Sequence, residues 1–290
     1  MTRPVTDSYT AMAAQDMIDA DRASGNEKLE ELPVDTLLTR ADDYLQNDNF
    51  QLAKLHFGMA LRKQPDSVRA LTGIGLALAR EGQDDKAMKP LQAALEVDNT
   101  YVAALLPLGK IMRSQSRFQE ARQHLETAYK YAADNPAVLT ELAITYDTMG
   151  VAKEAEPLFR RVVQLSPKQA AAHGNLGFNY FLQAKYPEAI TSLAEALHLD
   201  KTNARVRNNL AAAYALTGEE ERAFALLRDT VGEAGAYNDI GYIYMTSGNL
   251  DMAEKSFQRA LAAAPRHYLR ARRNLDALRQ LRAEAKKTSP

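Results

Sequence analysis

The chain has 290 residues, 46% hydrophobic, 25% charged and 7% aromatic, a globular composition in which alanine and leucine favour helix. Its 36 basic and 37 acidic side chains nearly cancel, which excludes the strongly positive field of a typical nucleic-acid binder. The absence of cysteine excludes disulfides, thiolate metal sites and thiol catalysis, and no run approaches the ~18 apolar residues of a membrane-spanning helix.

The charges are distributed unevenly between the two ends of the chain. Residues 1–50 carry eleven acidic and four basic side chains, whereas residues 266–290 carry eight basic and two acidic ones. Such ends either orient the molecule towards a charged partner or are solvated termini. The N-terminus lacks an apolar signal core, so we expect either a cytosolic protein or the processed or truncated form of an exported one.

Residues 1–33 precede any repeating pattern and are predicted to form an acidic, partly ordered arm or cap. A weak helical pattern runs from Ala11 to Ala20, with Met12, Met17 and Ile18 among acidic residues. Pro33 then marks the entry to the first repeat.

From residue 34 onward the sequence repeats every 34 residues. One alanine recurs at each step and then once more after a step of 30: Ala53, Ala87, Ala121, Ala155, Ala189, Ala223 and Ala253. A period of this size predicts stacked helical pairs that bury their apolar faces against their neighbours. The predicted solenoid covers residues 34–267, with the units 34–67, 68–101, 102–135, 136–169, 170–203, 204–233 and 234–267.

Each unit alternates small and large residues in its first helix. The eighth position is always Ala or Gly: Ala41, Gly75, Gly109, Ala143, Gly177, Ala211 and Gly241. A minimal side chain lets two helices approach closely, and the large residue three places later fills the adjacent gap. Four glycines are expected to end first helices: Gly82, Gly150, Gly218 and Gly248.

The last part of the chain departs from the regular period. The sixth unit is shortened, and Gly232 and Gly235 replace its closing segment, so we expect a kink before the seventh unit. Residues 268–290 are predicted to form a basic capping helix and tail that closes the last apolar surface. Four leucines are expected on one face of this helix: Leu269, Leu275, Leu278 and Leu281.

At this period the residues follow one order: small, large, alanine, aromatic or leucine, alanine, proline. This order resembles the tetratricopeptide repeat (TPR) family. The resemblance implies an all-α fold, a right-handed α-solenoid of seven helix-turn-helix units with a C-terminal capping helix. It also implies a concave groove lined by repeat positions two, five, nine and twelve. The sequence departs from the family pattern at His173 and Arg207, where a Trp or Leu is usual, and several units lack the closing proline.

The groove of the last four units is expected to hold partner proteins. The predicted contact residues are Ile144, Asn175, Phe178, Phe181, Arg205, Asn208, Asn238, Tyr242 and Met245. Aromatic side chains beside polar ones are typical of interaction hot spots. Phe178 and Phe181 could instead pack against adjoining units, and an asparagine at the place of Asn175 is common in the family for structural reasons.

The sequence contains no recognisable catalytic constellation. The five histidines are scattered without the spacing of metal ligands, so we expect no catalysis, no metal and no cofactor. The family's clamp for C-terminal carboxylates is not matched, because the fourth unit offers Thr140 and Ile144, and the sixth has Arg205 without the clamp's second cation. We therefore expect protein partners that present extended or helical segments with apolar anchors, and no small-molecule substrate.

A narrower resemblance concerns residues 205–218 and the restart at 237–242. These residues are similar to the TPR lipoprotein of tight-adherence (Tad) pilus assembly and to pilotin-like proteins of type IV pili. The resemblance implies a periplasmic, outer-membrane-associated protein and pilus or secretin components as partners. Because the chain has no cysteine, its lipid anchor would lie in a removed leader.

Other readings remain open. One is a cytoplasmic protein, and another is a regulatory or substrate-recruiting TPR module of a signalling or transferase system. A third is contact of the helix at 268–287 with anionic lipid or nucleic acid.

Overall fold

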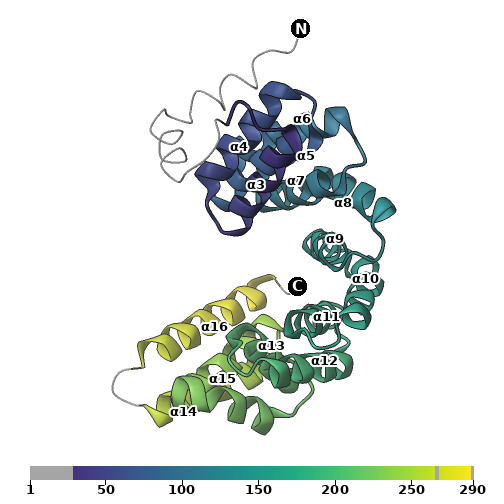
Figure 1. Ribbon diagram of the computed structural model, residues 1–290. Coiled ribbons are helices and arrows are strands. Elements are labelled where there is room, and N and C mark those ends of the chain that lie inside the picture. Colours follow the sequence, from purple (N-terminus) through teal and green to yellow (C-terminus); the bar gives the residue numbers. More distant parts are fainter. Residues whose placement is uncertain (1–28, 265–267, 289–290) are drawn as a thin grey trace. The chain divides into compact units, whose positions relative to one another are not determined.

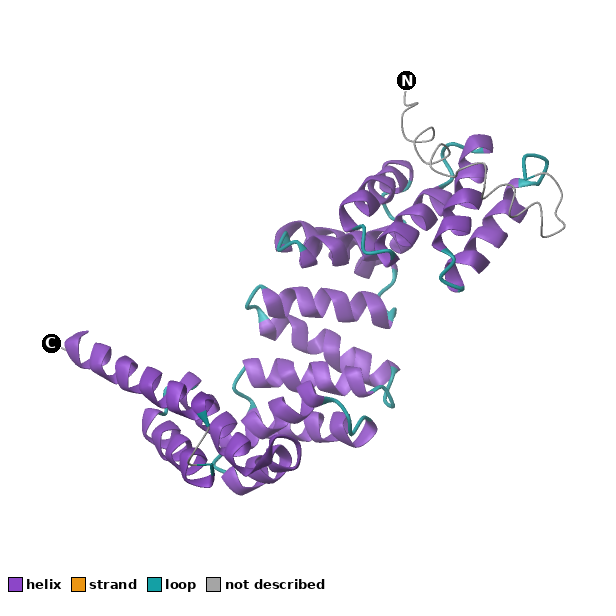
Figure 2. Cartoon of the chain, turned by 90° about the vertical axis from the view of Figure 1, so that its left-hand side faces the viewer, coloured by secondary structure: helices purple, strands orange, loops and turns teal. Residues whose placement is uncertain are grey.

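The computed structural model describes residues 29–264 and 268–288, and every regular element within them is a helix (Figures 1 and 2). The predicted all-helical fold is therefore confirmed. Most of the expected N-terminal arm, residues 1–28, lies outside the described residues. Its last part is ordered, because Leu29 and Leu32 are buried at 5% and 3% exposure.

The helices form two compact units that divide between Met149 and Gly150, within the fourth predicted repeat. The first unit contains α3 (Val34–Gln46), α4 (Phe50–Lys63), α5 (Val68–Arg80), α6 (Asp84–Val97), α7 (Val102–Ser114), α8 (Phe118–Tyr131) and α9 (Pro136–Thr148). The second contains α10 (Ala152–Leu165), α11 (Ala170–Leu182), α12 (Tyr186–Leu199), α13 (Ala204–Leu216), α14 (Glu220–Thr246), α15 (Leu250–Ala263) and α16 (Leu269–Thr288).

The first helix of each of the seven repeats is followed by a residue with left-handed backbone. The residues with positive φ at these turns are Asp48, Gly82, Ser116, Gly150, Ala184, Gly218 and Gly248. Glycine adopts this conformation without strain, as the pattern of glycines predicts, but Asp48, Ser116 and Ala184 adopt it as well. Left-handed backbone costs a residue with a Cβ roughly 1–2 kcal/mol. The packing of the two helices therefore enforces this turn even where the local sequence does not favour it.

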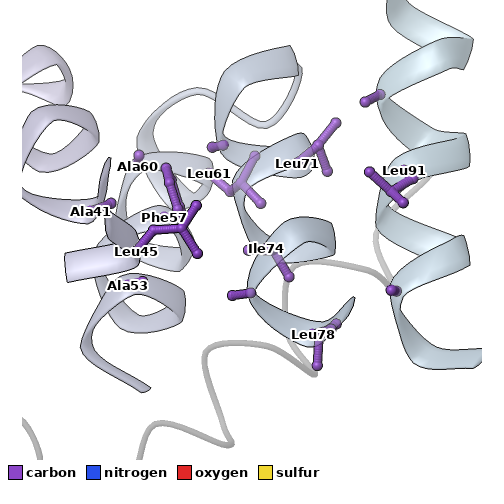
Figure 3. Packing of buried hydrophobic residues seen from close by; sticks show 14 of the residues in the cluster. Ala41, Leu45, Ala53, Phe57, Ala60, Leu61, Leu71, Ile74, Leu78 and Leu91 are labelled. Carbon is purple, nitrogen blue, oxygen red and sulfur yellow. The ribbon is translucent and has the colours of Figure 1, made fainter. Parts of the chain in front are cut away.

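The close approach of paired helices depends on the small residue at the eighth position. A Cβ added to Gly75 would lie 2.5 Å from Leu91 Cγ, and one added to Gly109 would lie 2.6 Å from Leu125 Cγ. In the first unit, Phe57 points between α3 and α5, close to Ala41 and Leu45 (Figure 3). The repeating alanines from Ala53 to Ala253 are all fully buried. The core is thus a series of identical small layers, one in each repeat.

Within each unit, the first helices of successive repeats are neighbours. In the first unit, α5 contacts α3 and α7, and α7 contacts α9, whereas the second helices α4, α6 and α8 make at most marginal contact with one another. In the second unit, α11 contacts α13, and α14 contacts α16. The first helices therefore lie on the inner side of each unit. We call their exposed surface the first-helix face.

The shortened sixth repeat joins the seventh through a break inside α14. Gly232 has φ 74° and ψ 173°, so α14 consists of two helical segments, which are the second helix of the sixth repeat and the first helix of the seventh. The Phe224 and Tyr237 rings pack across this break with centroids 4.6 Å apart. The kink expected from Gly232 is confirmed. Gly235 is buried, and a Cβ on it would lie 2.8 Å from Val231.

The C-terminal helix α16 packs on α15 and α14 and caps the second unit. Ala271, Leu275 and Leu278 form its buried face, with spacings of four and three residues. The prediction that Leu269 and Leu281 share this face is wrong, since they are 64% and 46% exposed. On a helix both are rotated away from Leu275 and Leu278, and the buried alanine takes the place expected for Leu269.

Candidate functional site

The first-helix face of the first unit is hollowed between α5 and α7. The cavity has a volume of about 630 Å³, and we call it the α5–α7 pocket. Its lining residues are Leu76, Ala79 and Arg80 of α5, Asp84 of α6, and Ala103, Leu106, Pro107, Lys110, Ile111, Arg113 and Ser114 of α7. The floor is mainly aliphatic and the rim is charged, as in sites that bury an apolar anchor and orient it with a few polar groups.

Pro107 gives the floor of this pocket one polar feature. It lies inside α7, four residues after Ala103, and both residues line the pocket. Proline has no N–H, so the carbonyl oxygen of Ala103 lacks its regular helical donor. A bound segment could supply a hydrogen-bond donor to this carbonyl group.

The cations on the rim differ in how far they are already paired. Arg113 Nη2 lies 2.9 Å from Glu141 Oε2 in an ion pair between α7 and α9. Arg80 Nη1 donates to the main-chain oxygen of Leu45 at 2.8 Å. Lys110 is exposed and has no carboxylate within 4.0 Å among the described residues. Arg80 Nη1 also lies 3.6 Å from Asp48 Oδ1, so Lys110 is the rim cation best placed to meet an acidic partner.

A second cavity lies on the first-helix face of the second unit. It has a volume of about 450 Å³. Asn208 of α13 lines it, together with Leu227, Asn238, Asp239, Tyr242 and Ile243 of α14, and Arg270 and Asn274 of α16. Three of the predicted contact residues, Asn208, Asn238 and Tyr242, are thus brought together. The capping helix contributes to the same cavity, which the sequence did not suggest.

Asn238 is buried within this polar cluster. Its side chain is fully inaccessible to solvent. Asn238 Oδ1 accepts a hydrogen bond from Asn274 Nδ2 at 2.9 Å, and Asn238 Nδ2 donates to Asp239 Oδ1 at 3.0 Å. Arg270 Nη1 lies 3.8 Å from the same Asp239 oxygen. Asn238 therefore fixes α16 against α14, while Asn208 and Tyr242, both exposed, remain accessible to a partner.

The other predicted contact residues of the second unit form two smaller groups. Arg205 Nη2 donates to Asn175 Oδ1 at 3.3 Å, so these two side chains lie together on α13 and α11. Phe181 is half-buried and meets the Tyr186 ring edge-on, with centroids 5.6 Å apart. Phe181 thus has an aromatic partner within its own repeat. Phe178 and Met245 are half-buried.

Ile144 is the one predicted contact residue that lies in the first unit. It is half-buried on α9.

The α5–α7 pocket was missed at the sequence level, although the signal for it was present. Leu76 and Ala79 occupy positions nine and twelve of the second repeat, and Ala103 and Leu106 occupy positions two and five of the third. The resemblance to the TPR family already implies that these positions line the groove, but contact residues are predicted from them only in the last four repeats. Applied to every repeat, the same rule locates the pocket.

The titratable residues that the structure describes form no cluster suited to a metal ion. Among residues 29–264 and 268–288, no group of three His, Asp or Glu side chains is placed to hold a metal ion. His56 is fully buried, with Nδ1 2.9 Å from the main-chain oxygen of Leu52. Burial lowers the pKa of His124. Within the same described ranges, no helix is long and apolar enough to cross a membrane.

Tetratricopeptide repeat models match four stretches of the chain: residues 38–101, 112–174, 179–218 and 234–267. Together they cover most of both units. The chain belongs to the tetratricopeptide repeat family. The TPR assignment made from the 34-residue period is confirmed, and so is the helix-turn-helix solenoid that it implied.

Individual relatives are distant. A TPR repeat-containing protein of Dictyostelium discoideum is 27% identical over 132 residues, which cover 43% of this chain and 50% of the relative. The chain spans half or less of the length of the curated relatives it matches.

Two solved structures show the same TPR fold. A tetratricopeptide repeat protein from Parabacteroides merdae has a TM-score of 0.58 at 17% identity, covering 84% of this chain and 98% of that one. Pseudomonas aeruginosa PilF has a TM-score of 0.59 at 19% identity, covering 68% and 90%. At these identities the likeness shows the fold alone.

Proposed function

We propose that this TPR protein is a non-enzymatic scaffold that binds segments of partner proteins on its first-helix face. TPR arrays are protein-interaction modules, and a solenoid presents an extended inner surface for this purpose. The observation that carries the proposal is the α5–α7 pocket, a cavity of about 630 Å³ with an aliphatic floor at the positions that the repeat turns towards a partner. The pocket could bury one or two apolar anchors of a bound segment.

The second unit offers a different kind of contact. Its pocket is lined largely by polar side chains, of which Asn208 and Tyr242 are exposed. Amide side chains can pair with the main chain of an extended peptide, and a tyrosine ring adds buried area at low entropic cost. We infer that this pocket fixes the register of a segment bound to the second unit, whereas the α5–α7 pocket buries apolar anchors of a segment bound to the first.

We further propose that the scaffold serves assembly of a bacterial pilus or secretion machine of the Tad or type IV pilus kind. The proposal rests on the similarity of residues 205–218 and 237–242 to the TPR lipoproteins of those systems. It is compatible with the shared fold of PilF. The corresponding location is the periplasm, at the outer membrane, with pilus or secretin components as partners. A reading frame upstream that encodes a leader with a lipidated cysteine would support this location.

The pilus proposal can be tested by replacing the chromosomal gene with a Leu106→Asp variant. Leu106 lies half-buried on the floor of the α5–α7 pocket, so a carboxylate there should abolish apolar binding. The matched control is Val97→Asp, which places the same charge at a 49% exposed residue at the end of α6, outside the pocket lining. Surface pili are counted by electron microscopy, and partners cross-linked in cells are identified by mass spectrometry.

We expect Leu106→Asp to lose pili and the cross-linked partner at an unchanged protein level, while Val97→Asp keeps both. Intact pili after deletion of the gene would reject the pilus role. Partners identified as a kinase or glycosyltransferase would indicate the alternative regulatory role. Full partner binding by Leu106→Asp would remove the α5–α7 pocket from the scaffold proposal.

A further inference from the structure

We propose that a cavity between the second helices of the sixth and seventh repeats binds arginine side chains from a basic segment of a partner protein. The cavity has a volume of about 590 Å³, and we call it the α14–α15 pocket. α14 contributes Glu220, Glu221, Phe224, Glu233 and Tyr237 to its lining, and α15 contributes Arg259 and its last turn. None of these residues holds a groove position of its repeat, so the proposal goes beyond the scaffold function and does not depend on it.

The α14–α15 pocket lies at the joint where the sixth repeat is shortened. The alanine series takes a step of 30 residues there instead of 34, and only the left-handed backbone of Gly232 separates the two segments of α14. The chain therefore enters the seventh repeat directly. Phe224 of the first segment and Tyr237 of the second both line the pocket, and both rings are half-buried. The pocket is thus a product of this irregular joint and not of the repeat itself.

A guanidinium group of the protein already lies in one part of the pocket. Arg259 Nη1 lies 2.5 Å from Glu220 Oε1, and Arg259 Cζ lies 5.7 Å from the centroid of the Tyr237 ring. A cation at this distance is attracted to the face of an aromatic ring. The Arg259 side chain is 57% exposed, so solvent reaches this arrangement. The chain itself therefore shows how the pocket receives an arginine, with a carboxylate at its end and a ring along its side.

Two further carboxylates of the pocket are unpaired. Glu221 and Glu233 are exposed, and neither has a basic side chain within 4.0 Å in residues 29–264 and 268–288. Since Arg259 already neutralises Glu220, the pocket retains two uncompensated negative charges. Its charge complement is a cationic partner.

The last turn of α15 points to the same chemistry by an independent route. Ala262 and Ala263 are exposed and line the pocket. The last carbonyl oxygens of a helix have no intrahelical donor, and the partial negative charge at this end attracts cations. The last turn of α15 contains no basic residue to meet them. A bound group with several N–H donors would satisfy both these oxygens and the free carboxylates.

These walls fit arginine better than other side chains. A guanidinium group carries five N–H donors in a fixed plane, against three on a lysine ammonium group. Its flat face also stacks on aromatic rings, as that of Arg259 approaches Tyr237. An acidic or purely apolar segment would leave Glu221 and Glu233 without a partner. A cavity of about 590 Å³ has room for one or two such side chains, so the expected segment carries one or two arginines.

The test is a titration of the full chain, labelled with nitrogen-15, with the peptide Gly-Ser-Arg-Gly-Arg-Ser-Gly. Amide signals are followed by NMR at low salt. The control peptide carries citrulline in place of both arginines, which keeps their shape and removes their charge. We expect the arginine peptide to shift the signals of residues that line the α14–α15 pocket and to bind roughly 10-fold more tightly than the citrulline peptide. Added salt should weaken this binding, because Glu221 and Glu233 are exposed.

Two carboxylates are then removed from the pocket. The double variant Glu221→Gln/Glu233→Gln should bind the arginine peptide about 3- to 30-fold more weakly. The matched control is Glu188→Gln/Glu195→Gln, which changes the net charge equally at two exposed residues of α12 outside the pocket lining. This control should bind as wild type. Circular dichroism checks that each variant is folded.

Removal of the protein's own cation gives the opposite expectation. Arg259→Gln frees Glu220 and the face of Tyr237, so it should strengthen binding of the arginine peptide roughly 3-fold or more. Arg228→Gln removes an exposed cation of α14 that does not line the pocket, and it should leave the affinity unchanged. A merely structural role of Arg259 would not produce a gain in binding.

Four results would overturn the proposal. They are equal binding of the arginine and citrulline peptides, shifts confined to residues away from the pocket, equal losses in the pocket and α12 double variants, and no gain in Arg259→Gln. Shifts of the same signals with protein concentration alone would assign the pocket to a second copy of the chain. The peptide comparison uses the unaltered protein, so it decides the question even where a variant does not fold. Loss of partners in Leu106→Asp concerns the first unit and is independent of every one of these results.

Discussion

The hydroxyl group of Tyr244 donates a hydrogen bond to the main-chain oxygen of Ala215, 3.2 Å away, and so connects the first helix of the seventh repeat to the end of α13. Glu220 Oε2 lies 3.4 Å from the same hydroxyl oxygen. This contact spans the joint where the sixth repeat is shortened. Burial, followed by the negative charge of Glu220, raises the pKa of Tyr244 to about 12.

Tyr244→Phe is predicted to destabilise the second unit and to change its response to alkali. Because the folded-state pKa of Tyr244 lies above its unfolded value of 10.0, the stability linked to its proton is fully present below pH 10. It is lost progressively as the pH rises from about 10 to about 12. Removing the hydroxyl group should cost about 1 kcal/mol at neutral pH and flatten this alkaline decline.

The measurement is urea unfolding of both proteins at several pH values between neutrality and pH 12. Tyr242→Phe, on the same helix but exposed, is the matched control and should leave the pH profile unchanged. An equal alkaline decline in wild type and Tyr244→Phe would show that other groups cause it.

Asn238→Ala is predicted to destabilise the fold, whereas Asn208→Ala is predicted to affect binding alone. Asn238 is fully buried, and its removal leaves Asn274 and Asp239 without their hydrogen-bond partner. Such a loss costs about 1–3 kcal/mol. The exposed Asn208 lines the same pocket, and its removal should change stability by less than about 0.5 kcal/mol. Thermal unfolding of the two variants distinguishes these roles, and equal midpoints would contradict the structural role of Asn238.

The fold could be predicted because the period of the sequence is also the period of the packing. Every alanine of the series from Ala53 to Ala253 is buried, and the small eighth residues lie where the helices touch. Less could be predicted at the turns. Ala184 has the same left-handed backbone as Gly150, with φ 57° and 78°, although its side chain gives no local signal for it.

The candidate site was predicted less well, because exposure at a repeat position depends on what lies beside it. Position five of the sixth repeat, Asn208, is exposed, while the same position of the seventh, Asn238, is covered by α16. Repeat positions carry no information on where a non-repeating helix packs. Likewise, no periodicity indicates that Phe181 pairs with Tyr186. Both contacts are specific to this chain.

Glu156→Gln is predicted to lower the stability of the fold at neutral pH and to make that stability less sensitive to acid. Glu156 Oε2 lies 2.7 Å from Lys185 Nζ, and Oε1 lies 2.9 Å from Arg160 Nη2. Burial favours the neutral form of Glu156, but hydrogen bonds from Lys185 and Gln183 outweigh it and place the pKa below the ordinary value of 4.5. The associated stability is therefore present above pH 4.5 and is lost as the pH falls through the folded-state pKa.

The loss in Glu156→Gln should be about 1 kcal/mol at pH 7, because Lys185 is partly solvated and its charge is screened. Glu195→Gln, an exposed residue of α12 chosen as the control, should behave as wild type. Urea unfolding at pH 7 and at pH 3 measures both effects. A Glu156→Gln variant with wild-type acid sensitivity would show that other carboxylates dominate it.

Gly177→Ala is predicted to destabilise the second unit even though alanine is the better helix former. Alanine in place of glycine gains about 1 kcal/mol of helix propensity. Here, however, the new Cβ would lie 2.6 Å from Leu193 Cγ and 3.0 Å from the main-chain nitrogen of Leu193. Relief requires movement of the Leu193 backbone as well as its side chain, and overpacking of this kind costs about 1–3 kcal/mol. We therefore expect the cost of overpacking to exceed the gain in helix propensity, so that the variant is less stable overall.

Leu193→Ala tests whether that contact is the cause. Alone it should cost about 2–5 kcal/mol, because Leu193 is fully buried and its removal leaves a cavity. When Leu193→Ala is combined with Gly177→Ala, the new methyl group has space, so the double variant should be more stable than the sum of the single effects by about 1–2 kcal/mol.

The equivalent position of the next repeat, Ala211, already accommodates a Cβ. Ala211→Gly should therefore also destabilise, by roughly 1 kcal/mol, since it loses propensity and contact. A stabilising Gly177→Ala, measured by urea unfolding, would mean that the close approach of α11 and α12 does not require glycine.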